Sequence, residues 1–190
     1  MLAKIGIGLA IVAVILAIAI ATRPNTFAVR RSATINAPAE VVYAQIHDLR
    51  RWPLWMSYDR MDPAIRRSYE GPATGVGAVY HYVSDKVGEG RMTIAALTPN
   101  ERVGIQAQFI KPFAATNDLE FTLQPAPGGV RVTWAMNGRN TLMGKAMSLF
   151  VNMDRMIGGD FEKGLADLKT LSEQEARTAQ AAPLPAGAAG

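Results

Sequence analysis

The sequence predicts an α+β protein in which a curved antiparallel sheet of about seven strands surrounds one long C-terminal helix, with a transmembrane helix preceding this domain. Three observations predict this architecture. An uncharged apolar run opens the chain from Ile5 to Ala21. Segments that alternate between apolar and polar residues then follow one another, and the last apolar pattern repeats at three- and four-residue steps. Alternation is typical of strands with one covered face, whereas the longer period is typical of an amphipathic helix.

The apolar run at the start of the chain is long enough to serve as a membrane anchor. As a helix, residues 5–21 would span about 25 Å, slightly less than the hydrocarbon core of about 30 Å. A cleaved signal peptide is the alternative, because Ala19 to Ala21 form a small-x-small cleavage site. We expect an uncleaved anchor, because the charged segment before the run is weak and the run is long for a signal sequence.

The anchor predicts a single-pass membrane protein, in the inner or plasma membrane if the protein is bacterial. The charges on either side of an anchor influence its orientation. Lys4 precedes the anchor, and Arg23, Arg30 and Arg31 follow it, which slightly favours a cytoplasmic domain and leaves the side of the membrane open.

We expect three regions along the chain. Residues 1–25 form the anchor and a linker, residues 26–172 form the folded ligand-binding domain, and residues 173–190 form a disordered tail. The tail is assigned from its composition, because it ends in a stretch rich in alanine, proline and glycine.

The composition excludes several classes of site. The net charge is +4 and no basic stripe is interleaved with aromatic residues, so we expect no nucleic-acid partner. The chain has no cysteine, and its two histidines, His47 and His81, have no cluster of carboxylates near them in the sequence. The sequence also contains no G-x-S-x-G elbow, H-E-x-x-H motif or phosphate loop. We therefore expect no metal and no cofactor.

The strands and the first helix of the domain follow from changes in the apolar period. Residues 27–35 alternate and predict a strand, although Arg31 falls on its apolar face. Pro38 lies in the first turn of a predicted helix that runs to Asp48. Six further strands are separated by glycine and proline turn signals: 65–71, 78–84, 90–98, 101–110, 117–125 and 129–138.

The last element is predicted as one long amphipathic helix from Thr141 to Leu171. Gly158 and Gly159 interrupt it, and each costs about 1 kcal/mol relative to alanine in a helix. Either the helix kinks there or its backbone approaches the sheet closely. Because only one long helix crosses a wide sheet, a cavity between the helix and the sheet is a natural consequence.

Few polar residues are candidates for chemistry. His81 lies between two tyrosines in a predicted strand, and Glu89 and Arg91 share a face at the start of the next strand. An ion pair between Glu89 and Arg91 is the simpler interpretation, and a buried acid with an anchoring cation is the alternative. An enzyme acting on an aromatic or polyketide-like substrate would use these residues or a tyrosine as acid–base groups.

Several motifs in the chain together resemble a known family. Residues 35–55, INAPAEVVYAQIHDLRRWPLW, resemble the start of the START-like, or SRPBCC, superfamily in its polyketide cyclase/dehydrase-type branch. GEGRMTI at 88–94, VTW at 132–134 and FEKGLADLK at 161–169 are similar to later motifs of that family. The resemblance implies the helix-grip fold, a deep hydrophobic cavity, and binding of a lipid or another bulky apolar molecule. It does not imply catalysis, since the superfamily includes carriers, co-chaperone-like modules and a few enzymes.

The resemblance also gives a place to the aromatic segment from Asp48 to Pro63. The superfamily has a short second helix there, which forms a lip over the cavity mouth. We expect one tryptophan in the core and the other, Trp55, at the entrance with Met56 or Tyr58, so that Trp55→Ala weakens the binding of apolar probes more than it lowers stability. The neighbouring arginines are expected to face water or lipid headgroups: Arg50, Arg51 and Arg60.

The sequence therefore favours a membrane-anchored, non-catalytic domain that binds a hydrophobic small molecule or lipid and leaves an enzyme open. A cyclase/dehydrase-like enzyme and a protein-interaction module are the alternatives. No catalytic residue is assigned. The expected cavity residues are Trp52, Trp55, Met56, Tyr58, Tyr80, Tyr82, Arg91, Phe109, Phe121, Trp134, Met143, Met147 and Phe150.

Overall fold

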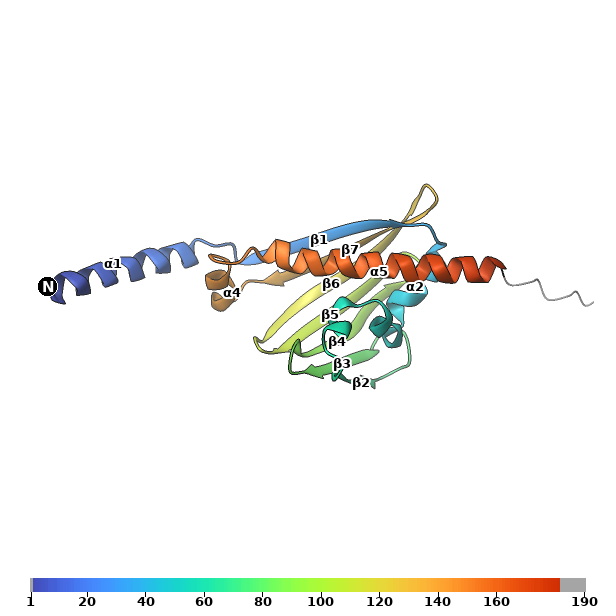
Figure 1. Cartoon of the computed structure of the whole chain (residues 1–190), viewed down its shortest axis with the longest axis horizontal. Helices are drawn as coiled ribbons and strands as arrows, with labels where there is room; N and C mark the ends of the chain where they lie inside the picture. Colours follow the sequence, from blue (N-terminus) through green and yellow to red (C-terminus); the bar gives the residue numbers. More distant parts are fainter. Residues whose placement is uncertain (1, 182–190) are drawn as a thin grey trace, which may run out of the picture.

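An antiparallel sheet of seven strands is the frame of the domain (Figure 1). The computed structural model describes residues 2–181. The spatial order is β1-β7-β6-β5-β4-β3-β2, so β2 to β7 form a meander and β1 joins the sheet by pairing with β7. The strands are β1 (Thr26–Ile35), β2 (Arg66–Glu70), β3 (Val79–Ser84), β4 (Gly88–Thr98), β5 (Arg102–Lys111), β6 (Ala115–Ala126) and β7 (Gly129–Arg139). The predicted antiparallel sheet is confirmed.

The sheet has one buried and one more exposed face, as alternation in the sequence predicts. In β7, the side chains of Val130, Val132 and Trp134 are buried, whereas Arg131 and Asn137 are exposed. Two register shifts between β4 and β5 interrupt the regular ladder, and such bulges bend a sheet. The buried side chains of the sheet share one hydrophobic core with Phe161, Leu165 and Leu168 of the long C-terminal helix, which runs across the sheet in Figure 1.

The C-terminal helical region differs from the prediction of one helix over residues 141–171. It forms two helices, α4 (Leu142–Met147) and α5 (Met153–Ala181), and the break lies at residues 148–152 rather than at the glycine pair. Gly158 and Gly159 lie inside the continuous helix α5. The alternative of a close approach is the correct one for Gly158, because a Cβ atom there would overlap the guanidinium group of Arg31.

Helix α5 also continues past the expected end of the folded domain. Glu173 accepts a hydrogen bond from the backbone N–H of Asn36 at 2.9 Å, and Glu175 accepts one from the side chain of Gln45 at 2.6 Å. Residues 173–181 are therefore helical and attached to the domain, which corrects the expectation of a disordered tail from residue 173. The remainder of that expected tail, residues 182–190, lies outside the described residues.

The remaining helices precede or connect the strands. A helix at the N-terminus, α1 (Leu2–Ala21), projects from one end of the domain, and no residue of its apolar window Lys4–Ala21 is buried (Figure 1). Three short elements connect β1 to β2: α2 (Ala39–His47), the 3₁₀ helix η1 (Leu49–Leu54) and α3 (Ser57–Met61). The predicted irregular segment after the first helix is thus two short helical pieces.

Candidate ligand cavity

A cavity of about 520 Å³ lies between the buried face of the sheet and helix α5. This volume is within the range of sites that hold small organic ligands. Its buried lining is apolar or aromatic: Trp52, Met56, Tyr82, Met92, Leu119, Trp134, Met136 and Phe161. More exposed side chains also line it: Ser57, Tyr58, Met61, Lys86, Val87, Phe109, Lys111, Pro112, Phe113, Met156, Ile157 and Asp160.

Part of the expected cavity set lines this space. The structure brings together Trp52, Met56, Tyr58, Tyr82, Phe109 and Trp134 around it. Trp134 stacks on Phe161 of α5 with ring centroids 4.0 Å apart, and the small residue Gly164 allows this ring to approach the helix. Tyr82 lies across β4 at Gly90, where a Cβ atom would be 2.5 Å from the tyrosine hydroxyl oxygen. Glycines opposite these rings therefore leave the space that the aromatic side chains occupy.

The expected roles of the two tryptophans are reversed. Trp52 lines the cavity, whereas Trp55 is a core residue whose ring meets Phe121 and Trp134 edge-on at 5.9 Å. Both indoles are fully buried and fixed by backbone carbonyls. The N–H of Trp52 donates to Ile46 at 2.9 Å, and that of Trp55 donates to Gln45 at 3.1 Å. Phe121 is buried in the same aromatic cluster and does not line the cavity.

Five other expected cavity residues lie elsewhere. Tyr80 is a core residue whose hydroxyl is bound to Asp59, and Arg91, which alternates with the cavity residue Met92 in β4, pairs with Glu70 at 2.8 Å on the other face of the sheet. Helix α4 is separate from α5, so the residues in and just after α4 do not reach the cavity. These are the remaining three: Met143, Met147 and Phe150. These placements correct the expectation for these residues.

Of the acid–base residues considered for an enzyme, the tyrosines Tyr58 and Tyr82 line the cavity, whereas His81, Glu89 and Arg91 do not. Glu89 pairs with Lys111 at 3.1 Å and with His81 at 3.3 Å, rather than with Arg91 as the sequence suggested. The hydrogen bond from Lys111, followed by that from His81, lowers the pKa of the Glu89 carboxyl group. Glu89 is therefore bonded to Lys111 and His81, and Arg91 to Glu70, and none of His81, Glu89 and Arg91 lines the cavity.

Sequence reasoning missed two kinds of lining residue. Met92, Leu119, Met136 and Phe161 were placed on apolar faces, so their burial was predictable but their contact with the cavity was not. The turns that supply Lys86, Val87 and residues 111–113 carry no apolar period, so no pattern in the sequence points to them.

A buried ionic cluster fixes helix α3 at the cavity. The carboxylate of Asp59 accepts hydrogen bonds from the hydroxyl of Tyr80 at 2.9 Å and from Nε of Arg67 at 2.6 Å. Arg60, on the same helix, pairs with Asp167 of α5. These contacts attach α3 to β2, β3 and α5, so the neighbouring side chains of Tyr58 and Met61 are held against the cavity.

Two polar atoms of cavity-lining side chains are buried without a hydrogen-bond partner among residues 2–181. They are the hydroxyl oxygen of Tyr58 and the indole nitrogen of Trp134. Burial raises the pKa of Tyr58 well above its usual value, so the hydroxyl keeps its proton and can donate. Buried polar groups in native proteins are nearly always paired, and an acceptor atom on a molecule in the cavity would satisfy these two donors.

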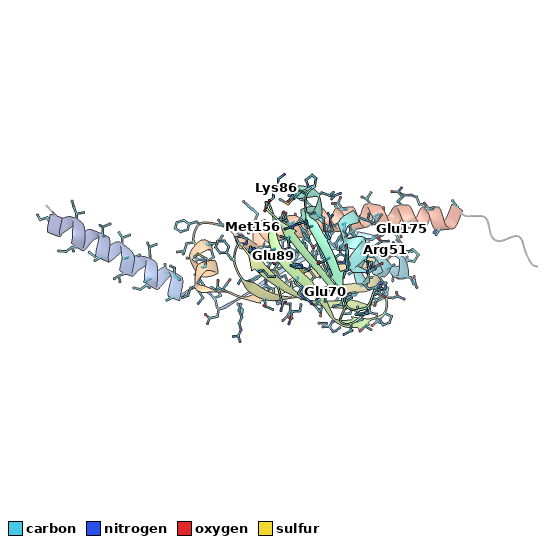
Figure 2. The ribbon with its side chains drawn as sticks, turned by 90° about the horizontal axis from the view of Figure 1, so that it is seen from below. Arg51, Glu70, Lys86, Glu89, Met156 and Glu175 are labelled. Carbon is cyan, nitrogen blue, oxygen red and sulfur yellow. The ribbon has the colours of Figure 1, made fainter. Side chains whose placement is uncertain are left out.

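The more exposed lining residues lie at the end of the sheet that adjoins α1. Thr26, the first residue of β1, pairs with Arg139, the last residue of β7. The register then places the β5–β6 and β3–β4 turns at this same end. Those turns contribute Lys86, Val87 and residues 111–113 to the cavity. Figure 2 shows Lys86 and Met156 on the side of the domain nearer α1, and Arg51 and Glu175 at the far end.

The comparisons with known proteins identify the fold family. Residues 26–173 match the family model described as "Polyketide cyclase / dehydrase and lipid transport". The chain belongs to this family. The SRPBCC relationship suggested by the motifs is therefore confirmed, and the domain is a ligand-binding domain of the SRPBCC type.

Solved structures of SRPBCC-type domains share the helix-grip fold. A protein from Chromobacterium violaceum is 18% identical with a TM-score of 0.58, and the match covers 80% of this chain and 99% of that chain. A protein from Mesorhizobium loti is 16% identical with a TM-score of 0.58, covering 78% of this chain and 98% of that chain. The di-domain ARO/CYC protein StfQ from the steffimycin biosynthetic pathway is 11% identical with a TM-score of 0.60, covering 80% of this chain and 52% of that chain. No curated protein matches the sequence.

Proposed function

We propose that the protein is a membrane-anchored, non-catalytic binding domain that takes up a hydrophobic small molecule or lipid from the adjacent bilayer. The observation that carries this proposal is the position of the cavity. Its exposed lining residues lie at the end of the sheet that continues into the apolar helix α1. A ligand that partitions into the membrane would therefore enter the cavity without crossing the length of the domain.

The linker between anchor and domain is short and held in place. Residues 22–25 separate α1 from β1, and four residues reach at most about 14 Å. Asn140 donates two hydrogen bonds to this linker. Its backbone N–H donates to the carbonyl of Asn25 at 2.9 Å, and its side-chain amide donates to the carbonyl of Pro24 at 3.0 Å. An anchored α1 thus keeps the mouth of the cavity near the headgroups.

The lining indicates the chemistry of the ligand. Methionine thioethers adapt to irregular apolar shapes. Five methionines line the cavity: Met56, Met61, Met92, Met136 and Met156. The unpartnered donors of Tyr58 and Trp134 favour a ligand with an oxygen acceptor on an otherwise apolar body. An isoprenoid alcohol or ketone, or the ester group of a lipid, has this chemistry.

Binding is tested with the full chain in detergent. Extraction of the purified protein and mass spectrometry of the extract should recover an apolar molecule, and a panel of lipids and fluorescent apolar probes should displace it. The proposal is wrong if no apolar molecule copurifies and no member of the panel binds.

An enzyme of the cyclase/dehydrase type is a second candidate. Tyr58 favours it, because its hydroxyl is buried, its ring lies 5.4 Å from that of Tyr82 between centroids, and both residues line the cavity. Burial raises the pKa of Tyr82 to about 12, so both tyrosines would act as proton donors rather than as bases. Incubation of the bound molecule with the protein, followed by its recovery, distinguishes the two functions. An unchanged mass and spectrum supports binding alone, whereas loss of water or ring closure supports catalysis.

A further inference from the structure

Helix α4 and the turn after it expose large apolar side chains. The side chains of Leu142 and Phe150 are 76% and 83% exposed, and those of Met143 and Val151 are 54% and 38% exposed. We call these four residues the α4 patch. Single exposed apolar residues are common on soluble domains, but four within ten positions indicate a surface that is covered in the working state.

The polarity of α4 is the reverse of that in a helix packed on a soluble core. Its buried residue is Lys145, only 8% exposed, whose Nζ donates to the side chain of Asn25 at 2.6 Å. The helix is fixed at its start by Thr141, whose hydroxyl accepts a hydrogen bond from the N–H of Gly144 at 3.1 Å. The chain therefore uses its polar contacts to attach α4 to the linker and directs the apolar side chains of Leu142 and Met143 outward.

The α4 patch lies at the membrane end of the domain. Helix α4 follows the last residue of β7, contacts α1, and is attached to the linker through Asn25 (Figure 1). Two exposed cavity residues, Phe113 and Met156, add apolar surface at this same end. Arg23 in the linker and Arg139 at the end of β7 are exposed, and their side chains can reach lipid phosphates.

We infer that the α4 patch is a bilayer-docking surface that inserts into the boundary between headgroups and acyl chains beside α1. This inference rests on the proposed anchoring by α1, and it adds a second point of attachment. One spanning helix leaves the domain free to rotate and tilt, whereas a second apolar contact fixes its orientation. Amphipathic helices insert to a depth of about 5–10 Å in this way. The docked domain then holds the mouth of the cavity against the lipid.

The α4 patch contacts lipid rather than a protein partner because it is held close to the anchor α1. A linker of four residues, bound to Asn140 and Lys145, keeps the α4 patch next to the point where α1 leaves the membrane. A protein partner covering the patch would have to fit between the domain and the headgroups.

Single-cysteine labelling tests the depth of the patch in the full chain, which has no cysteine of its own. An environment-sensitive fluorophore is attached to Leu142→Cys or to Phe150→Cys. Val12→Cys in α1 reports the anchor, and Gln124→Cys, exposed at the far end of β6, reports the solvent. Each variant is reconstituted into phosphatidylcholine vesicles with and without quenchers on the acyl chains, and iodide is used as the aqueous quencher.

The inference predicts that acyl-chain quenchers reach the labels at positions 142, 150 and 12, and that iodide reaches only the label at position 124. If iodide quenches the labels at 142 and 150 as strongly as the label at 124, the docking surface is wrong. If lipid quenchers still reach position 12 in that case, the anchoring by α1 is unaffected. Labels at 142 and 150 shielded from both quenchers would show coverage by a second copy of the chain and would also overturn it. A label at position 12 that no lipid quencher reaches overturns the anchoring itself.

A kinetic experiment tests the role of the patch in ligand uptake. The double variant Leu142→Ser with Phe150→Ser should slow the transfer of a fluorescent apolar probe from vesicles about tenfold, because two large side chains no longer contact lipid. The affinity of the detergent-solubilised protein for the same probe should not change. Val76→Ser, which alters an exposed apolar residue of the β2–β3 turn at the far end, is the matched control. Equal transfer rates for the double variant and this control would contradict a role of the patch in uptake.

Discussion

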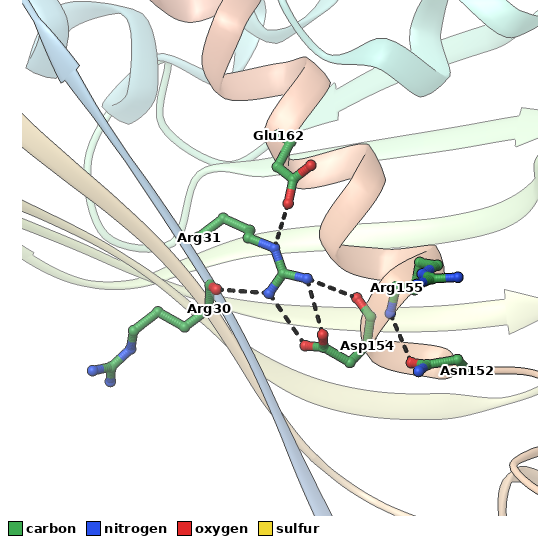
Figure 3. A network of polar contacts seen from close by, with 6 residues as sticks. All are labelled: Arg30, Arg31, Asn152, Asp154, Arg155 and Glu162. Atoms are coloured by element: carbon green, nitrogen blue, oxygen red, sulfur yellow. Dashed lines mark hydrogen bonds and ion pairs between the residues drawn. The ribbon is translucent and has the colours of Figure 1, made fainter.

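The guanidinium group of Arg31 joins β1 to the first turns of α5 by binding the carboxylate of Asp154 at 2.9 Å (Figure 3). It also donates to Glu162 at 2.7 Å and to the backbone carbonyl of Asp154 at 3.1 Å. This explains why an arginine stands on the otherwise apolar face of β1. The contact sets the position of the α5 segment that lines the cavity, from Met156 to Phe161.

The two neighbouring glycines of α5 should respond oppositely to alanine. A Cβ atom at Gly158 would overlap Arg31, so Gly158→Ala should lower the free energy of unfolding by about 1–3 kcal/mol, as overpacking does. A Cβ atom at Gly159 would meet no atom of the described residues within 4 Å, so Gly159→Ala should raise it by up to about 1 kcal/mol. Chemical denaturation of the full chain in detergent measures both. A stabilising Gly158→Ala would show that the glycine is not needed for the close approach.

The ion pair also predicts part of the pH dependence of stability. The hydrogen bond from Arg31 holds the pKa of the Asp154 carboxyl below its usual value. A folded-state pKa below the unfolded one contributes stability that is present above the unfolded pKa and is lost as the pH falls through the folded pKa. Asp154→Asn should therefore flatten the acid limb of a plot of Tm against pH and leave the neutral region nearly parallel to that of the wild type. Because the Asp154 side chain is 59% exposed, the effect should be small and should shrink at high salt. An acid limb of unchanged steepness at low salt would argue against this contribution.

The two buried tyrosine hydroxyls differ in partner and should differ in the effect of their removal. Tyr58→Phe removes an unpartnered hydroxyl, so the ligand-free protein should keep or gain stability while the affinity for an oxygen-bearing ligand falls about three- to tenfold. Tyr80→Phe removes a donor to the buried Asp59, so it should lower the free energy of unfolding by about 1–3 kcal/mol. Thermal denaturation and probe titration measure the two effects. An unchanged affinity in Tyr58→Phe would remove this hydroxyl from the proposed ligand site.

The reversed roles of the two tryptophans give a matched pair of variants. Trp52→Phe and Trp55→Phe each lose a hydrogen bond to a backbone carbonyl and part of a buried ring, so both should lower the free energy of unfolding by a comparable amount of about 1–3 kcal/mol. Only Trp52 lines the cavity, so only Trp52→Phe should change the affinity for apolar probes. Titration of the two variants with the same probe decides this, and an equal change in affinity would contradict the assignment of Trp55 to the core.

The fold could be predicted further from the sequence than the site could. Alternation in Val130, Val132 and Trp134 reports which face of a strand is covered, because the side-chain period of a strand is two. The same pattern does not report whether a covered side chain touches a cavity or another side chain, which is why Trp55 was misplaced. The break between α4 and α5 was not visible because Met143 and Phe150 continue the helical period although they face outward.

The end of the folded domain was misplaced for a different reason. Composition suggested disorder after Ser172, but Glu173 and Glu175 are attached to the domain by hydrogen bonds to Asn36 and Gln45. Such pairs join positions more than a hundred residues apart in the chain, so a local window of sequence cannot contain both partners. Arg31 and Gly158 are a further example, because each appears as an exception in its own element and is explained only by the other.

The most direct test of the central claim is native mass spectrometry of the full chain released from lipid nanodiscs. Wild-type protein should carry one apolar molecule per chain. Leu119→Trp, which places a larger side chain in the cavity wall, should reach the detector folded and without it. A wild-type protein that is released empty from every lipid composition, or a Leu119→Trp variant that retains the molecule at the same occupancy, would contradict a cavity that takes up its ligand from the membrane.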